Sequence, residues 1–149
     1  MSNNNQNHRK FLKSREKNQV QLGEYFPKEL FVEELESYKD QANIIFIMGS
    51  TCSACDFDPI KQFTTKHSEL KYIMFYEGVK DKIESYNFQF PIISVDLYEF
   101  NKIFAYNFVP FVLGLNDLNQ IIGLGTFYSE KDIENIVYPL LRVYKYEKS

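Results

Sequence analysis

The chain has 149 residues, of which 44% are hydrophobic and 25% charged, as in one globular domain with a proper core. Its formal net charge of -3 and its pI near 5.4 argue against a surface that mainly binds nucleic-acid phosphates. No apolar run approaches the roughly 18 residues that a membrane-spanning helix needs, so no membrane span is expected.

Residues 1 to 20 are rich in Asn, Gln, Lys and Arg, with too few apolar groups to offset the entropy lost on ordering. They predict a flexible tail, and residues 21 to 149 are expected to form a single domain. The same stretch lacks the apolar core of a secretory signal. A cytoplasmic location is therefore expected, with an extracytoplasmic one as the alternative if a signal was removed before this numbering begins.

Helix and strand patterns alternate along the rest of the chain. Pro27 suits the start of a helix in PKELFVEELESYKDQ. The apolar run at 44–48 ends in Gly49 and predicts a buried strand. The patterns predict further helices at about 52–67, 79–87, 97–107 and from 129 on, and further strands at 70–77, 90–96, 110–115 and 121–127.

The order of these elements predicts a mixed central sheet with helices on both faces. Helices between the early strands imply parallel pairing, whereas the two late strands are separated by a turn and are expected to form a hairpin. Ser129 with Asp132 has the spacing of a capping box for the last helix. Pro139 is expected to kink that helix or to split it near Tyr138.

The two cysteines of the chain, Cys52 and Cys55, follow the first predicted strand as a C-x-x-C pair. A zinc site needs four ligands, and the two histidines, His8 and His67, lack the spacing to complete one. Two buried, reduced thiols with a packing role are a second alternative. A redox pair is the favoured interpretation, because the pair lies where a buried strand meets the start of a helix.

A helix N-terminus suits such a pair, since its unpaired N–H groups and the helix dipole stabilise a thiolate. Cys52, at the edge, is the candidate to attack a partner disulfide. Cys55, expected one turn further and more buried, is the candidate to resolve the mixed disulfide.

Residues 43 to 137 resemble the thioredoxin fold, and specifically the redoxins of the TlpA and MauD type. TCSAC stands where that family has its active-site C-x-x-C after a strand, and FPIISVD resembles the family strand that ends in Asp, here Asp96. AYNFVPFVLGLNDLNQIIG resembles the family's proline-led strand, turn and second strand. The resemblance implies a thioredoxin-like three-layer α/β/α sandwich with a mixed central sheet.

The resemblance also implies a cis-proline at Pro110 that faces the cysteines. The backbone of Val109 would then pair with an extended substrate segment. Thr51 and Ser53, which flank Cys52, complete the candidate substrate-binding residues. The implied function is a thiol–disulfide oxidoreductase that acts on protein or peptide thiols and disulfides, with no cofactor beyond its own dithiol. A reductase or oxidase would recycle it, and a narrower expectation is an accessory that matures one peptide or enzyme.

Several positions depart from the family pattern. Thr51 replaces a Trp, and Phe46 replaces a buried Asp that assists proton transfer at the second cysteine, which leaves Asp58, Glu77 or a water as substitutes. Pro59 comes one residue early, so a helix kink with shifted register is expected. Asp56 stands where a basic residue is usual and would oppose a Cys52 thiolate, an effect that a hydrogen bond from Ser53 would offset. These departures keep a second interpretation open, a thioredoxin-like binding module with little redox turnover.

A peroxidase is disfavoured, because Gly49 stands where peroxiredoxins carry a Thr three residues before their cysteine. The many aromatic residues are expected to pack mainly in the core, and the positions with inward-facing spacing are Phe88, Phe90, Phe100, Phe104, Phe108 and Phe111. Phe111 has a second interpretation, as the wall of an apolar groove near Cys52 that would favour hydrophobic peptide partners.

Overall fold

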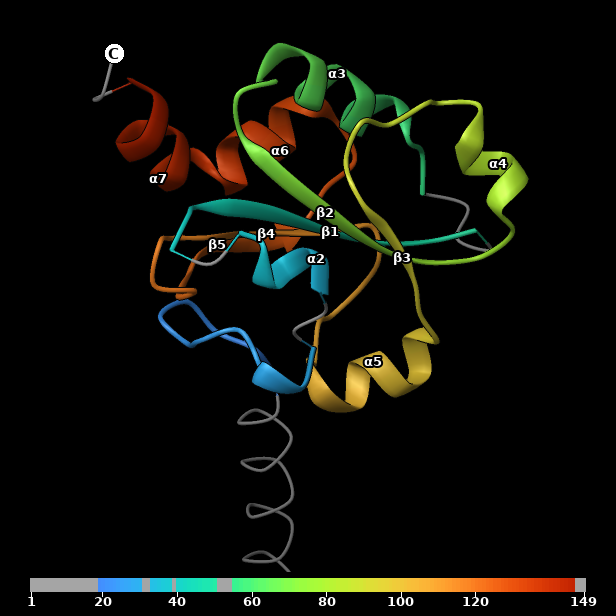
Figure 1. Cartoon of the computed structure of the whole chain (residues 1–149), viewed down its shortest axis with the longest axis horizontal. Helices are drawn as coiled ribbons and strands as arrows, with labels where there is room; N and C mark the ends of the chain where they lie inside the picture. Colours follow the sequence, from blue (N-terminus) through green and yellow to red (C-terminus); the bar gives the residue numbers. More distant parts are fainter. Residues whose placement is uncertain (1–18, 31–32, 39, 51–54, 147–149) are drawn as a thin grey trace, which may run out of the picture.

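The computed structural model describes residues 19–30, 33–38, 40–50 and 55–146, and it contains a five-stranded sheet between helices (Figure 1). The strands are β1 (Asn43–Gly49), β2 (Lys71–Glu77), β3 (Ile92–Ser94), β4 (Phe111–Leu115) and β5 (Ile121–Thr126). The helices are η1 (Lys28–Leu30), α2 (Glu33–Glu36), α3 (Asp58–Lys66), α4 (Lys80–Glu84), α5 (Leu97–Ile103), α6 (Glu130–Ile136), α7 (Tyr138–Leu141) and the π-helical turn η2 (Arg142–Tyr146).

The sheet has the strand order β3-β2-β1-β4-β5. β1 pairs in parallel with β2, and β2 in parallel with β3, whereas β4 pairs antiparallel with both β1 and β5. The predicted combination of parallel early strands and a late hairpin is therefore confirmed. β1 lies at the centre, and all seven of its residues are buried, as the continuous apolar run predicts.

Alternate residues of the central strands enter two different hydrophobic clusters, one on each face of the sheet. Phe46 and Met48 of β1 pack in a cluster with residues of α3 and α6, and Ile45 and Ile47 pack on the other face with residues of η1, α2 and α5. Figure 1 shows the same layers, with α3 and α6 above the sheet and α2 and α5 below it. The three-layer arrangement is thus confirmed.

The C-terminal helices follow the predicted signals. The Ser129 hydroxyl accepts a hydrogen bond from the Asp132 N–H, and the Asp132 carboxylate accepts one from Ser129 in return, so the capping box is confirmed. The helix stops at Ile136, and α7 begins at Tyr138 with Pro139 in its first turn, so the predicted split is also confirmed. The first helix, predicted as one, is described as two short pieces, η1 and α2, with residues 31–32 outside the described ranges.

Residues 19 to 26 run from the end of α5 to the start of β5. Gln19 bridges Ala105, and the Val20 N–H donates to the Ala105 carbonyl. Further on, the Ile121 N–H donates to the Glu24 carbonyl, and Tyr25 bridges Gln120. This segment therefore occupies the start of the outer edge of β5. The rest of the stretch predicted as a flexible tail, residues 1–18, lies outside the described residues.

An ionic contact joins the C-terminal end of α3 to α6. Lys66 Nζ lies 2.7 Å from Glu134 Oε1, and the Nε2 atom of the buried His67 lies 3.6 Å from the same oxygen. The hydrogen bond from Lys66, with a smaller contribution from His67, lowers the pKa of Glu134 below its usual range. The contact therefore stabilises the fold only while Glu134 is ionised.

Glu134→Gln is expected to destabilise the fold by roughly 0.5 to 1 kcal/mol at pH 7, since Lys66 is mostly exposed and a solvated ion pair contributes little. Because the folded-state pKa of Glu134 is lowered, its stabilising effect is complete above the usual Glu pKa of about 4.3 and disappears as the pH falls through the lowered value. Urea unfolding of both proteins from pH 7 to pH 3 measures this. Glu130→Gln is the control, since its carboxylate lies 4.0 Å from Lys66, and an equal loss in both variants would contradict the assignment.

Candidate redox site at the end of β1

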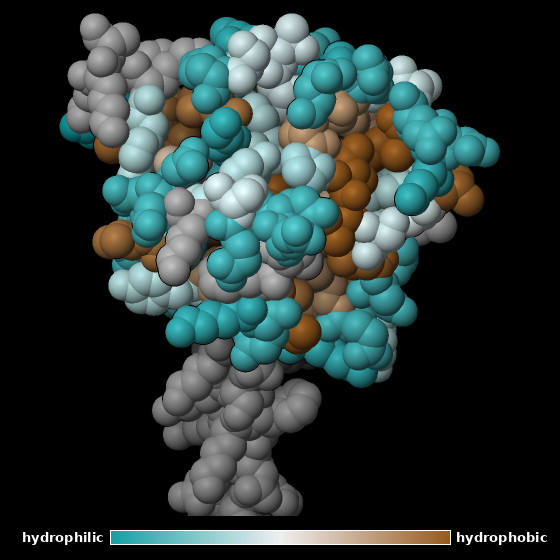
Figure 2. Space-filling model, in the orientation of Figure 1, coloured by the Kyte–Doolittle hydropathy of each residue, from teal (hydrophilic) through white to brown (hydrophobic). Residues whose placement is uncertain are grey.

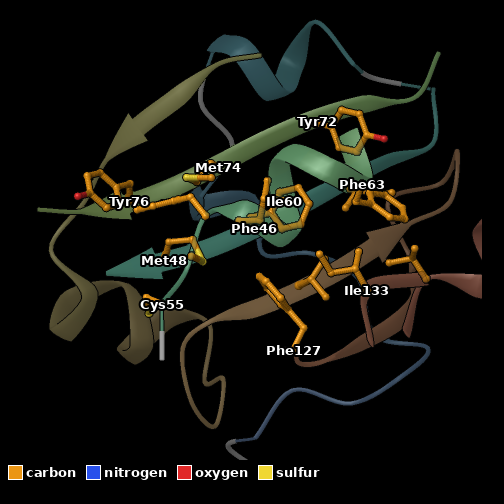
Figure 3. Close-up of a cluster of buried hydrophobic side chains, with 14 of the residues drawn as sticks. Phe46, Met48, Cys55, Ile60, Phe63, Tyr72, Met74, Tyr76, Phe127 and Ile133 are labelled. Carbon is orange, nitrogen blue, oxygen red and sulfur yellow. The ribbon is translucent and has the colours of Figure 1, made fainter. Parts of the chain in front are cut away.

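Cys55 is 6% exposed and belongs to the hydrophobic cluster on the α3 side of the sheet. Figure 3 places it at the end of the cluster where β1 finishes, toward Met48 and Tyr76, while Phe63 and Tyr72 lie at the other end. The burial expected for the second cysteine is therefore present. Cys52, Thr51 and Ser53, the other candidates of this motif, lie outside the described residues.

The start of α3 corrects two predictions. The helix begins at Asp58, with Phe57 as its N-cap, so Cys55 lies before α3 and not one turn inside it. Asp56 Oδ1 accepts a hydrogen bond from the Asp58 N–H at 2.9 Å, a local turn that competes with helix at this position. Pro59 has no N–H and fits the first turn, so it starts the helix and does not kink it.

Phe46, at the position of the family's buried Asp, is fully buried and fills the centre of the cluster (Figure 3). Its ring centroid lies 6.0 Å from that of Phe127 and 6.1 Å from that of Tyr72. The two predicted substitutes are exposed carboxylates with other partners. Asp58 accepts a hydrogen bond from the Tyr86 hydroxyl at 3.0 Å, and Glu77 accepts one from the Leu97 N–H at 2.7 Å.

Tyr76, at the end of β2, is a buried residue whose pKa depends in part on the charge of Cys55. Its hydroxyl donates to the Val79 carbonyl at 3.1 Å. Burial raises the pKa of Tyr76, a hydrogen bond with the Ser50 side chain opposes the rise, and the charge of a Cys55 thiolate adds to it. Ser50 is also held by its backbone, since its N–H donates to the Glu77 carbonyl at 2.9 Å. The chain that leads into the cysteine motif is therefore fixed to the end of β2.

The pairing of β1 with β4 brings Pro110 to the same end of the sheet. Ile47 lies opposite Phe111, so Pro110 lies beside the last residues of β1, which lead to the cysteine motif. The Val109–Pro110 peptide bond is cis, the geometry that the resemblance implies. Val109 is half-buried and packs against the cluster that contains Cys55. The strand register thus joins two motifs that are far apart in the sequence.

The aromatic residues near Pro110 confirm the core packing mainly expected for Phe111 and correct the prediction for Phe108. Phe111 is 2% exposed and packs against Phe104 and Tyr106, so it is a core residue and not the wall of a groove. Phe108, predicted to point inward, is instead 71% exposed. It lines an open surface pocket of about 520 Å³ together with Val109, and Tyr98, which is also exposed, lies in the same pocket.

Spacing did not reveal the Phe108 surface, because Phe108 lies in a segment without regular secondary structure. A periodic pattern assigns a direction only inside a helix or a strand. The position of Phe108 directly before Val109-Pro110 was the available signal.

Known proteins match this chain in structure but not in sequence. No protein-family model and no curated protein matches it. A solved thioredoxin-like protein in its oxidised form superposes with a TM-score of 0.68 at 14% identity, over 83% of this chain and 98% of that one. A DsbF homologue from Corynebacterium diphtheriae gives a TM-score of 0.58 at 12% identity, over 70% and 75% of the two chains.

A secreted thiol-disulfide isomerase from Corynebacterium glutamicum gives a TM-score of 0.56 at 14% identity, over 72% of this chain and 75% of that one. The chain therefore has a thioredoxin-like fold. In addition, no helix of the described residues is long and apolar enough to cross a membrane.

Gly78→Ala is expected to destabilise the protein by roughly 1 to 3 kcal/mol. Gly78 has a φ of 154°, and a Cβ atom there would overlap the Ser50 side chain and approach the Tyr76 hydroxyl. Denaturant unfolding measures the loss. Gly114→Ala is the matched control, since its Cβ atom would meet the flexible end of Leu140 at 3.3 Å, and an equal cost at both positions would contradict the tight contact at Ser50.

Proposed function

We propose that this protein is a thiol–disulfide oxidoreductase that exchanges disulfides with protein or peptide substrates through Cys52 and Cys55. The observation that carries the proposal is the position of Pro110. The β1–β4 register places Pro110 beside the end of β1, and Val109 packs against the cluster that holds a buried Cys55. The thioredoxin-like fold and the C-x-x-C sequence support the same chemistry.

In the proposed reaction, the Cys52 thiolate attacks one sulfur of a substrate disulfide. A bond forms between Cys52 and that sulfur, and the other substrate sulfur leaves as a thiolate that takes up a proton. Cys55, after losing its proton, then attacks the Cys52 sulfur. This step forms the Cys52–Cys55 disulfide and releases the second substrate thiolate, so the substrate gains the two electrons that the protein loses. A separate reductase restores the dithiol, and an oxidase drives the same steps in reverse.

Burial gives the two cysteines different roles in this scheme. Cys55 is shielded within an apolar cluster, so a bulky substrate cannot approach it directly. The sulfur of Cys52, only three residues away in the sequence, is instead the atom that Cys55 attacks in the resolving step. Cys52 is therefore the attacking residue and Cys55 the resolving residue.

The substrate is proposed to lie along Val109 and Pro110, with Thr51 and Ser53 beside Cys52. The backbone of Val109 would pair with an extended segment by strand addition. The exposed rings of Phe108 and Tyr98 border this position, and they favour a segment with apolar side chains. An accessory role in the maturation of one peptide or enzyme is consistent with such a selective surface.

The finer affiliation is proposed to be with the TlpA and MauD type. The FPIISVD segment supports it, because Asp96 follows β3 and caps α5 by accepting hydrogen bonds from the N–H groups of Tyr98 and Glu99. The similar protein from Corynebacterium glutamicum is described as secreted, which supports the extracytoplasmic alternative for this chain over the cytoplasmic one.

A binding module without turnover is the second candidate, and Phe46 favours it. The ring occupies the place of the family's buried carboxylate, and the nearby acids Asp58 and Glu77 already accept hydrogen bonds elsewhere. In this alternative the surface around Val109 and Phe108 holds a partner while the thiols stay reduced.

Cys55→Ser is expected to accumulate mixed disulfides through Cys52 when the protein is incubated with an oxidised peptide, because the resolving thiol is missing. Mass spectrometry of the alkylated mixture measures the adduct. Cys52→Ser is the matched control and should form far less adduct, since its remaining thiol is buried. Equal adduct in both variants would contradict the assigned roles, and no adduct in either would favour the binding module.

Phe108→Ala is expected to lower kcat/KM by about tenfold, equivalent to roughly 1.4 kcal/mol, for peptide disulfides with apolar residues beside the cysteine. Peptides with polar residues there should be affected much less. Tyr25→Ala is the control, because Tyr25 is a comparably exposed aromatic residue on another part of the surface. A uniform loss across both peptide classes would contradict a role of Phe108 in substrate selection.

A further inference from the structure

The edge strand β3 lies in an uncharged stretch of the chain. From Phe88 to Val95 the sequence is FQFPIISV, without a Lys, Arg, Asp or Glu. Figure 2 shows a stripe of hydrophobic surface on the face where β3 lies in Figure 1, and apolar residues of this stretch, Phe88, Phe90, Ile92, Ile93 and Val95, are only partly buried. Sheet edges normally carry charges or bulges that prevent pairing with another strand. This edge carries neither among its own residues.

The outer backbone groups of β3 belong to Ile92 and Ser94. The Met74 N–H donates to the Pro91 carbonyl at 3.1 Å, and the Val95 N–H donates to the Tyr76 carbonyl at 3.0 Å. Groups alternate in direction along a strand, so Pro91, Ile93 and Val95 use theirs toward β2, while Ile92 and Ser94 point theirs outward. Pro91 does not blunt the edge, because its missing N–H is on the β2 side.

The two edges of the sheet differ in how far other parts of the chain cover them. The start of β5 is covered by the segment around Glu24 and Tyr25, which hydrogen-bonds to Ile121 and bridges Gln120. Within the described part of the chain, β3 pairs only with β2. An apolar strand with one open side favours an added strand from another molecule.

We propose that this edge binds the same edge of a second copy, antiparallel and around a two-fold axis at Ile93. In this register Ile92 lies opposite Ser94 of the partner, and Ser94 lies opposite the partner's Ile92. Each outward N–H then meets an outward C=O, which gives four hydrogen bonds and one sheet continuous through both copies. The two Ile93 side chains pack against each other at the axis, on the face that carries α5.

Charge complementarity favours a second copy over an unrelated peptide. A pocket of about 540 Å³ at the N-terminal end of the stripe is lined by Lys61 and Lys71 around the rings of Phe88 and Phe90. The other end of the stripe is acidic, with Asp96 directly after Val95 and the Glu77 carboxylate bound to the Leu97 N–H. Antiparallel pairing places Phe90 opposite the partner's Asp96. Each basic end therefore faces an acidic end, twice, by symmetry.

Sedimentation equilibrium of the full chain, from micromolar to hundreds of micromolar and with a reducing agent present, tests the proposal. The reductant excludes disulfide-linked dimers, so this result does not depend on the proposed redox function. A reversible monomer–dimer equilibrium is expected. Ile93→Lys, which sets two like charges against each other at the axis, should weaken it by about tenfold or more.

Ser94→Lys supplies a second variant that is expected to fold, because Ser94 is exposed, and it should also weaken the dimer. Leu118→Lys is the control. Like Ile93→Lys it replaces an apolar residue by a charged one, but at an exposed position in the β4–β5 turn, and it should leave the dimer intact. Amide hydrogen exchange gives an independent readout. The Ile92 and Ser94 amides should exchange more slowly as the protein concentration rises, while the Ile93 and Val95 amides should not change.

Three results would overturn the proposal. The first is a monomer at every concentration. Protection of the β3 amides by an added extended peptide, with the protein still monomeric, would belong to this outcome. The second is a dimer that Ile93→Lys and Ser94→Lys leave unchanged. The third is a dimer weakened as strongly by Leu118→Lys as by either β3 variant.

Discussion

The pairing of β1 with β2 on one side and β4 on the other is the constraint on which the rest of the structure depends. β1 is buried on both faces, so a shift of one residue would exchange the contents of the two hydrophobic clusters. The same register sets Ile47 opposite Phe111 and therefore brings Pro110 beside the end of β1. The position of Pro110 in the proposed redox site therefore depends on a strand register that packing on both faces fixes.

Strong local patterns made most of the fold predictable. The apolar run of β1, the Ser129–Asp132 capping box and the break at Pro139 each depend on neighbouring residues alone. The start of α3 was not predictable in the same way, because the Asp56 side chain and Pro59 outweighed the residue pattern that predicted a helix from Cys52. Phe111 packs in the core as mainly expected, whereas Phe108 does not, since direction in an irregular segment is set by tertiary packing.

The sequence indicates which residues belong to the candidate site, but not the contacts that set the pKa of Tyr76 beside it. Cys55 and Pro110 stand out in the sequence, but the contact of Tyr76 with Ser50, and its sensitivity to Cys55, require the parallel pairing of β2 with β1. The β3 edge is similar, since an uncharged stretch becomes informative only when its strand is found at the border of the sheet. Pro110 borders β1 in the sheet interior, whereas β3 forms the outer edge, so the proposed substrate position and the proposed dimer axis lie on different strands.

The most direct test of the central claim is a redox titration of the pure protein against glutathione, with alkylation and mass spectrometry of Cys52 and Cys55. The account predicts a reversible two-electron couple, in which both thiols become resistant to alkylation together and the intact mass falls by the two hydrogens lost on disulfide formation. Thiols that stay reduced across the biological range, or that oxidise independently of each other, would contradict it.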